Sequence, residues 1–160
     1  MSAPYAPIGD RLRRFREGLD VSQGLFARLL GISQQALSQL ESGKNQPSRA
    51  TIEMLDVRFG MRRQWLVDGE GEAFSWEWRE NEHFIGQAIR TLRTSKNLER
   101  DELAADLETD IDEVRLVEQG LLHPTADYLE RFYARLGLRR GEVRRIAREL
   151  EREAETRRRS

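Results

Sequence analysis

One short stretch of this 160-residue chain carries side chains that could read the edge of another molecule by hydrogen bonding. A glutamine amide donates and accepts at the same time, so it can pair with the N6 and N7 edge of adenine in the major groove of DNA. Each good pair of this kind discriminates between bases by roughly 1–3 kcal/mol. Taken alone, such residues could equally form a solvated helix face. The residues in question are Gln34, Gln35, Ser38 and Gln39.

The elements that must position these side chains are predicted to be helices, because apolar residues recur at helical spacing throughout the chain. Ser22 and Ser33 are good N-caps for two short helices, and Gly31 between them tolerates the positive φ of a tight turn. Leu37 and Leu40 would anchor the second helix to a core and leave its polar residues facing outward. Two helices joined in this way are the parts of a helix-turn-helix.

Residues 8–66 resemble the Cro/CI (XRE) family of helix-turn-helix regulators. The resemblance rests on SQQALSQLESGK at 33–44, VSQ at 21–23 and WLVDGEG at 65–71. It implies that Gln34, Gln35, Ser38 and Gln39 read bases, and that Arg16 pairs internally with Glu41. Because residues 1–49 are also basic, with seven cations against four acids, the DNA interpretation is favoured over a solvated face. The implied DNA backbone contacts are Gln23, Ser33, Lys44, Asn45, Gln46 and Arg49.

The residue pattern of 8–66 recurs 77 positions later, at 85–143, and no gap is needed to align the two copies. Ile8-Gly9 returns as Ile85-Gly86, and a fixed offset held this long is typical of a duplicated unit. The prediction is therefore an all-α chain of two tandem five-helix, lambda-repressor-like domains at 1–72 and 85–160. The second domain would end in an extended helix from Gly141 to about residue 155, and 73–84 would be a connector.

The second copy keeps the fold residues and loses the DNA chemistry. Arg93 and Glu118 repeat the internal ion pair, but Ile111, Asp112 and Leu116 occupy the base-reading positions. Residues 99–118 hold nine acids against two arginines, a field that repels phosphate. We expect this copy to serve homodimerisation. The alternative is that its acidic face binds a basic protein partner or imitates DNA.

Two further groups are candidates for the dimer interface. Trp76 and Trp78 lie two residues apart, which suggests an extended connector with both rings on one side. They could cover the seam between the domains or anchor a dimer, where tryptophan is enriched. Val143, Ile146 and Leu150 form an apolar stripe at helical spacing.

Composition narrows the function classes. Cysteine is absent and the two histidines, His83 and His123, lie far apart, so the sequence predicts no metal site, no cofactor and no enzyme. It offers no membrane-spanning run or signal peptide, which predicts a cytoplasmic protein. The leading hypothesis is a dimeric repressor of phage or mobile-element type on a pseudo-palindromic operator in double-stranded DNA. The alternative is an antitoxin-like or adaptor protein whose acidic second domain binds a protein.

Overall fold

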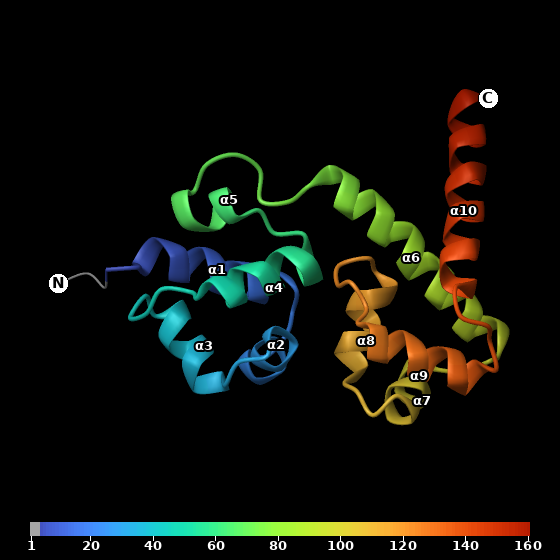
Figure 1. Ribbon diagram of the computed structural model, residues 1–160, viewed down its shortest axis with the longest axis horizontal. Coiled ribbons are helices and arrows are strands. Elements are labelled where there is room, and N and C mark those ends of the chain that lie inside the picture. The colour runs from blue at the N-terminus through green and yellow to red at the C-terminus, as the bar shows by residue number, and fades with distance from the viewer. Residues whose placement is uncertain (1–3) are drawn as a thin grey trace. The chain divides into compact units, whose positions relative to one another are not determined.

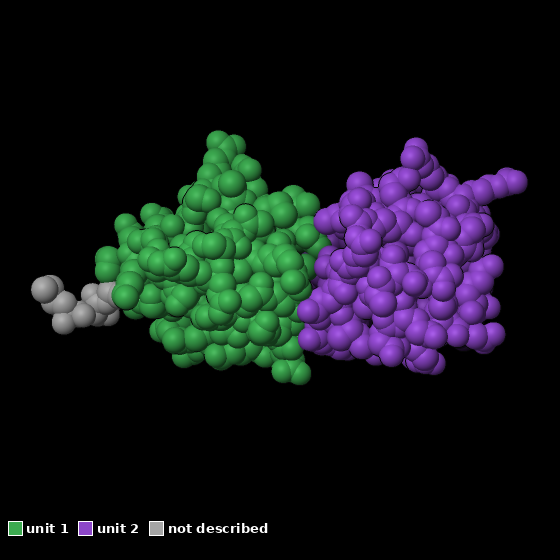
Figure 2. Space-filling view, turned by 90° about the horizontal axis from the view of Figure 1, so that it is seen from below, with its two compact units in different colours: residues 1–75 green, residues 76–160 purple. Residues whose placement is uncertain are grey.

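The computed structural model describes residues 4–160, and ten α-helices form within that range (Figure 1). The all-α fold class is therefore confirmed. The chain divides into two compact units, residues 1–75 (unit 1) and 76–160 (unit 2), drawn in green and purple in Figure 2. Unit 1 contains α1 (Ala6–Gly18), α2 (Gln23–Leu30), α3 (Gln34–Glu41), α4 (Arg49–Phe59) and α5 (Arg63–Asp68). Unit 2 contains α6 (Trp76–Ser95), α7 (Arg100–Asp106), α8 (Ile111–Glu118), α9 (Ala126–Leu136) and α10 (Glu142–Arg159).

The helices of unit 1 begin where the capping residues predict. The Ser22 and Ser33 hydroxyls each accept a hydrogen bond of 3.1 Å, from the N–H groups of Leu25 and Ala36. These bonds satisfy donors that the first turn of a helix leaves unpaired. Gly31 ends α2 with φ 70°, a conformation in which glycine has no Cβ to clash. The turn between α2 and α3 is thus specified locally by the sequence.

The core of unit 1 is built around aromatic rings from four separate parts of the chain. The ring centroid of Phe15 lies 5.9, 5.4 and 5.5 Å from those of Phe26, Phe59 and Phe74. Leu37 is completely buried. Full burial of a leucine stabilises a fold by roughly 1.5–3 kcal/mol, so α3 is firmly fixed to this core. The polar face of α3 therefore sits on a rigid support.

Unit 2 repeats the helix spacing of unit 1. Helices α7, α8 and α9 begin at Arg100, Ile111 and Ala126, each 77 residues after the starts of α2, α3 and α4. The expected extended connector was wrong, because α6 already begins at Trp76. Its first turns contain neither glycine nor proline, and Glu82 and Phe84 are buried, so tertiary packing continues the helix backwards.

The two tryptophans consequently do not share one side. Two residues advance a helix by about 200°, so the rings of Trp76 and Trp78 point in different directions. Trp76 is 63% exposed, and Trp78 is half-buried.

The last helix is longer than the sequence indicated. Helix α10 continues to Arg159, past the predicted end near residue 155, and packs along α6 (Figure 1). Val143 and Ala147 are buried in this contact. None of the helices found in residues 4–160 combines the length and the apolarity needed to cross a bilayer.

Candidate nucleic-acid interface

The outer face of α3 presents an unobstructed row of polar side chains. Gln34, Gln35 and Ser38 are exposed, while Leu37 and Leu40 on the opposite face are buried. Gly24 in α2 lies next to Gln34, since a Cβ at Gly24 would be in van der Waals contact with the Gln34 Oε1 atom, at 3.5 Å. The arrangement offers amide donors and acceptors on a short helix of the size that the major groove admits.

Gln39 is the exception among the predicted base readers. It is half-buried, and its Oε1 accepts a hydrogen bond of 2.8 Å from Asn45 Nδ2. The Gln39 carbonyl also accepts from the backbone N–H of Lys44 at 3.0 Å. These bonds tie the loop after α3 to the end of the helix. Gln39 and Asn45 therefore hold each other, and they place the exposed Lys44 and Gln46 beside α3.

The end of α3 is held by a buried carboxylate. Glu41 accepts from Arg16 at 2.6 Å (Nε to Oε1) and 3.0 Å (Nη2 to Oε2), so the expected ion pair is present. Gln23 Nε2 donates to the same carboxylate at 2.8 Å. The hydrogen bond to Glu41 raises the pKa of Arg16 above its ordinary value. Gln23, expected at the DNA backbone, thus has an internal role that was not predicted.

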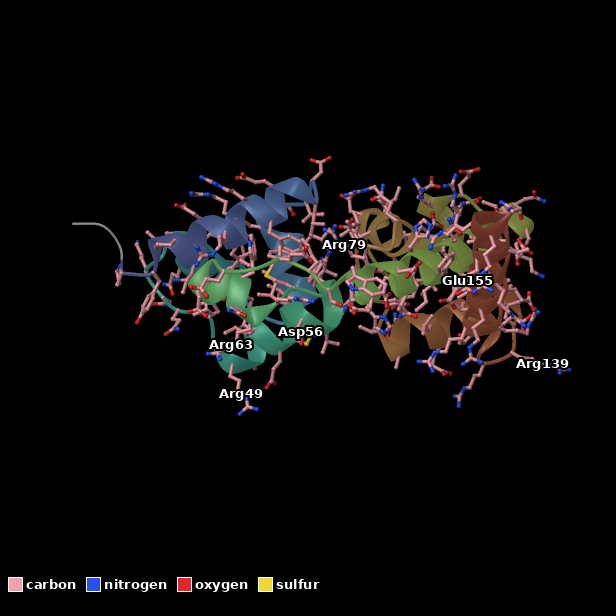
Figure 3. The ribbon with its side chains drawn as sticks, turned by 90° about the horizontal axis from the view of Figure 1, so that it is seen from above. Arg49, Asp56, Arg63, Arg79, Arg139 and Glu155 are labelled. Carbon is pink, nitrogen blue, oxygen red and sulfur yellow. The ribbon has the colours of Figure 1, made fainter. Side chains whose placement is uncertain are left out.

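Two more predicted backbone residues lie at helix starts. Ser33 is exposed but uses its hydroxyl to cap α3. The side chain of Arg49 is 92% exposed, pairs with Glu53 at 2.7 Å, and projects away from α4 in Figure 3. Exposed surface pairs of this kind contribute little to stability, so Arg49 can exchange its partner for a phosphate at small cost.

Comparison with known proteins agrees with this geometry. Residues 7–64 match a family model described as a helix-turn-helix domain. Unit 1 therefore contains a helix-turn-helix domain. A 65-residue stretch is 35% identical to the HTH-type transcriptional regulators for conjugative elements R391 of Providencia rettgeri, SXT of Vibrio cholerae and pMERPH of Shewanella putrefaciens. It covers 41% of this chain and 30% of each relative. No solved structure gives a significant match.

In unit 2 the corresponding carboxylate, Glu118, is bonded to two cations, whereas Glu41 of unit 1 is bonded to one. Glu118 accepts from Arg93 Nε at 2.5 Å and from Arg100 Nε at 2.7 Å. Arg100 stands 77 residues after Gln23, so a cation replaces a neutral amide beside the carboxylate. The hydrogen bond to Glu118 raises the pKa of Arg93.

A close helix crossing explains one glycine in each unit. At Gly9 in α1, a Cβ would lie 2.5 Å from the Leu40 carbonyl oxygen. At Gly86 in α6, it would lie 2.5 Å from the Val117 carbonyl oxygen. Real Cβ atoms do not come so near to backbone, so only glycine lets these helices meet. Glycine therefore recurs at positions 9 and 86 because the packing of the helices requires it.

The outer face of α8 differs from that of α3 in chemistry and in geometry. Ile111 is 48% exposed, and Asp112 is half-buried and bonded to Arg115 at 2.9 Å. Leu116, aligned with Gln39, is completely buried, so this position belongs to the core of unit 2. Glu108 replaces the turn glycine and adopts φ 52°. The positions of unit 2 that align with Gln34, Gln35 and Gln39 thus carry no glutamine.

Unit 2 also contains a buried polar cluster that the sequence did not reveal. Glu82 is 2% exposed, and its Oε1 lies 2.8 Å from His123 Nδ1 and 3.1 Å from Asn81 Nδ2. Neither the carboxylate nor the imidazole has a like residue 77 positions earlier, where Tyr5 and Gln46 stand. This cluster joins the start of α6 to the loop before α9. Within residues 4–160, no group of three or more side chains is arranged to hold a metal ion.

Proposed function

We propose that this protein is a sequence-specific DNA-binding transcriptional regulator whose α3 enters the major groove. The observation that carries the proposal is the row of exposed Gln34, Gln35 and Ser38 on a helix whose other face is buried. Amides on a rigid support can discriminate between base edges, whereas a mobile side chain would lose that selectivity.

The backbone contacts fit the same docking. Lys44, Asn45 and Gln46 follow α3 and are exposed, and Arg49 stands at the start of α4. Cations and amides around the base-reading helix fix its register on the duplex through phosphate contacts. In this arrangement Ser33 contributes through the capped helix N-terminus, and Gln23 contacts the backbone only from its place beside Glu41.

We also propose that the protein regulates a mobile element and that it acts as a repressor. It is supported by the three relatives, each named as a transcriptional regulator for a conjugative element.

We further propose that the protein binds as a homodimer through unit 2, on a pseudo-palindromic operator in double-stranded DNA. Its surface would be the groove between α6 and α10, which includes the exposed Trp76 together with Leu150 and Ala154. Ile146 and Leu150 are half-buried and retain contact area. Val143, which belongs to the same apolar stripe, is buried between α10 and α6 and contributes to the unit's own core instead. Dimers of helix-turn-helix proteins place two reading helices about one DNA turn apart.

Selection of bound sites from random DNA tests the base-reading role. Gln34→Ala with Gln35→Ala should remove the selected consensus, with a loss of roughly 1–3 kcal/mol for each amide that pairs with a base. Ile111→Ala with Asp112→Ala, at the aligned positions of unit 2, is the matched control and should select the same sites as the wild type. An unchanged consensus in the α3 variant would show that these residues do not read DNA.

Sedimentation of the full chain tests the dimer. Trp76→Ala should shift the equilibrium towards monomer and weaken operator binding at low protein concentration. Leu121→Ala removes another exposed apolar side chain of unit 2 and should leave the association unchanged. Equal sedimentation of all three proteins would rule out an interface at Trp76.

A second candidate function is an antitoxin-like or adaptor role, favoured by the acids around α7 and α8. Glu99, Asp101, Glu102 and Glu108 are exposed, and the first two line one pocket with the exposed Ile111. Acids around an apolar side chain suit a basic protein partner. Co-purification from the native host tests it. A stoichiometric basic partner that no longer binds when these acids are changed to amides would place this function first, and its absence would leave the repressor proposal alone.

A further inference from the structure

Helix α10 carries a row of arginines on the side that faces solvent. Arg144, Arg148 and Arg152 follow each other at four-residue spacing, which advances about 40° around a helix each time, and Arg159 falls into the same sector. All four are exposed, and within residues 4–160 none of them forms an ion pair. Arg152 Nε donates only to the Arg148 carbonyl, at 3.2 Å. We call these four residues the arginine row.

The other arginines of α10 are already engaged. Arg145 bonds to Glu142 at 2.6 Å and to Glu149 at 2.7 Å. Arg158 bonds to Glu80 of α6 at 3.2 Å and, like Arg157, lines the groove beside α6. The helix therefore separates cations that serve the unit's own structure from cations that are available to a partner.

The side chains around the arginine row indicate which kind of partner it can bind: a membrane, a protein or a nucleic acid. The apolar residues of α10 lie outside this sector: Val143 and Ala147 are buried against α6, and Ile146, Leu150 and Ala154 are half-buried. The sector that holds the arginine row therefore contains only charged side chains. A helix that lies on a membrane needs an exposed apolar face, and a protein hot spot needs apolar or aromatic anchors. A phosphate backbone needs neither, because it is bound through charge alone.

We propose that the arginine row is a second DNA contact, which binds the phosphate backbone of duplex DNA without regard to sequence. The row extends over about 22 Å, and duplex DNA carries one negative charge per about 1.7 Å, so several phosphates lie within its reach. The inference rests on the proposed function, since base reading by α3 is what brings the chain to DNA. Unit 2 then has two faces of opposite character, an acidic one around α7 and α8 and a cationic one on α10.

Two acids lie at the arginine row. Glu151 is exposed beside it and lines a pocket with Arg144 and Arg148. Glu155, labelled in Figure 3, lies in the same sector of α10, is exposed and forms no ion pair in the described part of the chain. It should weaken phosphate binding by repulsion. Glu155→Gln is therefore expected to strengthen binding to duplex DNA of random sequence. No such gain is expected if α10 does not contact DNA.

The test measures how the affinity for a duplex of random sequence falls with salt. In Arg148→Gln/Arg152→Gln/Arg159→Gln, the slope of log K against log salt between about 50 and 200 mM should become shallower by about 0.9 for each phosphate that is no longer neutralised. Arg131→Gln/Arg135→Gln/Arg140→Gln removes the same formal charge from arginines of unit 2 that are held in ion pairs. This control should keep a slope close to that of the wild type.

The outcomes separate the two proposals. Equal slopes in the arginine-row variant and the wild type would overturn the second DNA contact, as would an equally shallow slope in the control variant. Tighter binding to phosphatidylglycerol-rich vesicles than to DNA would replace it by a membrane surface. The variant Gln34→Ala/Gln35→Ala should lose site selection and keep the wild-type slope on random DNA. If the wild type itself selects no site, the proposed function fails, while the slopes still decide the arginine row.

Discussion

Helices α3 and α8 are each the third helix of their unit, and they show what this position fixes and what it leaves free. Both are eight residues long, begin at a capped residue and end at a buried glutamate. Their inward residues are apolar in both units. Their outward residues share nothing, since α3 shows Gln34 and Gln35 where α8 shows Ile111 and Asp112. Packing constrains the first set and partner chemistry the second, so the outward set is where the two units differ in function.

The carboxylates at the ends of these helices extend the comparison to energetics. Glu41 is bonded to one arginine and one glutamine, and Glu118 to two arginines. A buried charge that loses its partner keeps its desolvation penalty, so each cluster is more costly to break than a surface pair. Unit 2 should therefore depend more on its carboxylate than unit 1 does.

The largest expected effect follows from this difference. Glu118→Ala leaves the buried Arg93 without its carboxylate and removes the partner of Arg100, whose side chain is 36% exposed. It should reduce the free energy of unfolding of unit 2 by about 3–5 kcal/mol, mainly through Arg93. Glu41→Ala strands one arginine and one neutral amide, and should cost unit 1 about 1.5–3 kcal/mol. Hydrogen exchange followed by mass spectrometry measures the two units separately, through peptides from α8 and α3.

A surface variant provides the control for this pair. Glu17 lies 3.9 Å from Arg16 with a side chain that is 59% exposed, so Glu17→Ala should change stability by less than about 1 kcal/mol. A larger loss of stability for Glu41→Ala than for Glu118→Ala would show that the number of cations on the carboxylate does not set its contribution.

Sequence reasoning predicted the fold where the signals are local. Ser22 and Ser33 cap helices, Gly31 has positive φ, and α3 buries Leu37, because each depends on a few neighbouring residues. It failed at Trp76, where the spacing of the two tryptophans favoured an extended connector. That segment is helical because buried residues further along α6 continue the helix, which is a tertiary effect that no local pattern contains.

The candidate site was predictable to a similar depth. The outward position of Gln34, Gln35 and Ser38 follows from helical periodicity and is found in the structure. The bonds of Gln39 to Asn45 and of Gln23 to Glu41 do not follow, because they depend on side-chain rotamers and on the packing of separate helices. The sequence did contain one usable sign for the second bond, since Gln23 and Arg100 share the offset of 77 residues and both can donate to a carboxylate.

A smaller effect is expected at the turn before α8, the helix that corresponds to α3. Glu108 holds φ 52°, a conformation that costs a residue with a Cβ roughly 1–2 kcal/mol. Glu108→Gly should therefore stabilise unit 2 by about 0.5–1 kcal/mol, after the greater freedom of glycine in the unfolded chain is subtracted. The ion pair of Glu108 with Arg131, at 3.4 Å, is exposed and contributes little.

The reverse change at the aligned position completes this test. Gly31→Ala introduces a Cβ at φ 70° and should destabilise unit 1 by about 1 kcal/mol, although open space surrounds the position. Urea unfolding of both variants measures the two signs. A loss of stability in Glu108→Gly would show that the side chain, and not the backbone, determines this turn in unit 2.

The smallest effect at neutral pH concerns the buried Tyr128 hydroxyl, whose counterpart in unit 1, the Thr51 hydroxyl, has a hydrogen-bond partner. Tyr128 is 4% exposed, and its hydroxyl has no hydrogen-bond partner in residues 4–160, whereas Thr51 at the aligned position bonds to Ser48 at 2.9 Å. Burial, with Glu118 and Glu113 nearby, raises the pKa of Tyr128 well above its ordinary value. Tyr128→Phe removes an unpaired polar group, so at neutral pH it should leave stability unchanged or increase it by up to about 1 kcal/mol.

The pH dependence of stability distinguishes the effect of the buried Tyr128 phenol from a simple change in packing. Because the folded phenol keeps its proton while the unfolded one loses it above about pH 10, Tyr128 favours unfolding increasingly as the pH rises beyond that value. The decline can reach about 1.4 kcal/mol per pH unit, and Tyr128→Phe should be free of it. Urea unfolding from pH 7 into the alkaline range, followed by hydrogen exchange at α9, measures the difference.

Tyr5→Phe makes the same chemical change in unit 1 and should leave α9 unaffected. Parallel alkaline curves for the wild type and Tyr128→Phe would mean that the phenol reaches solvent or a partner in the folded protein.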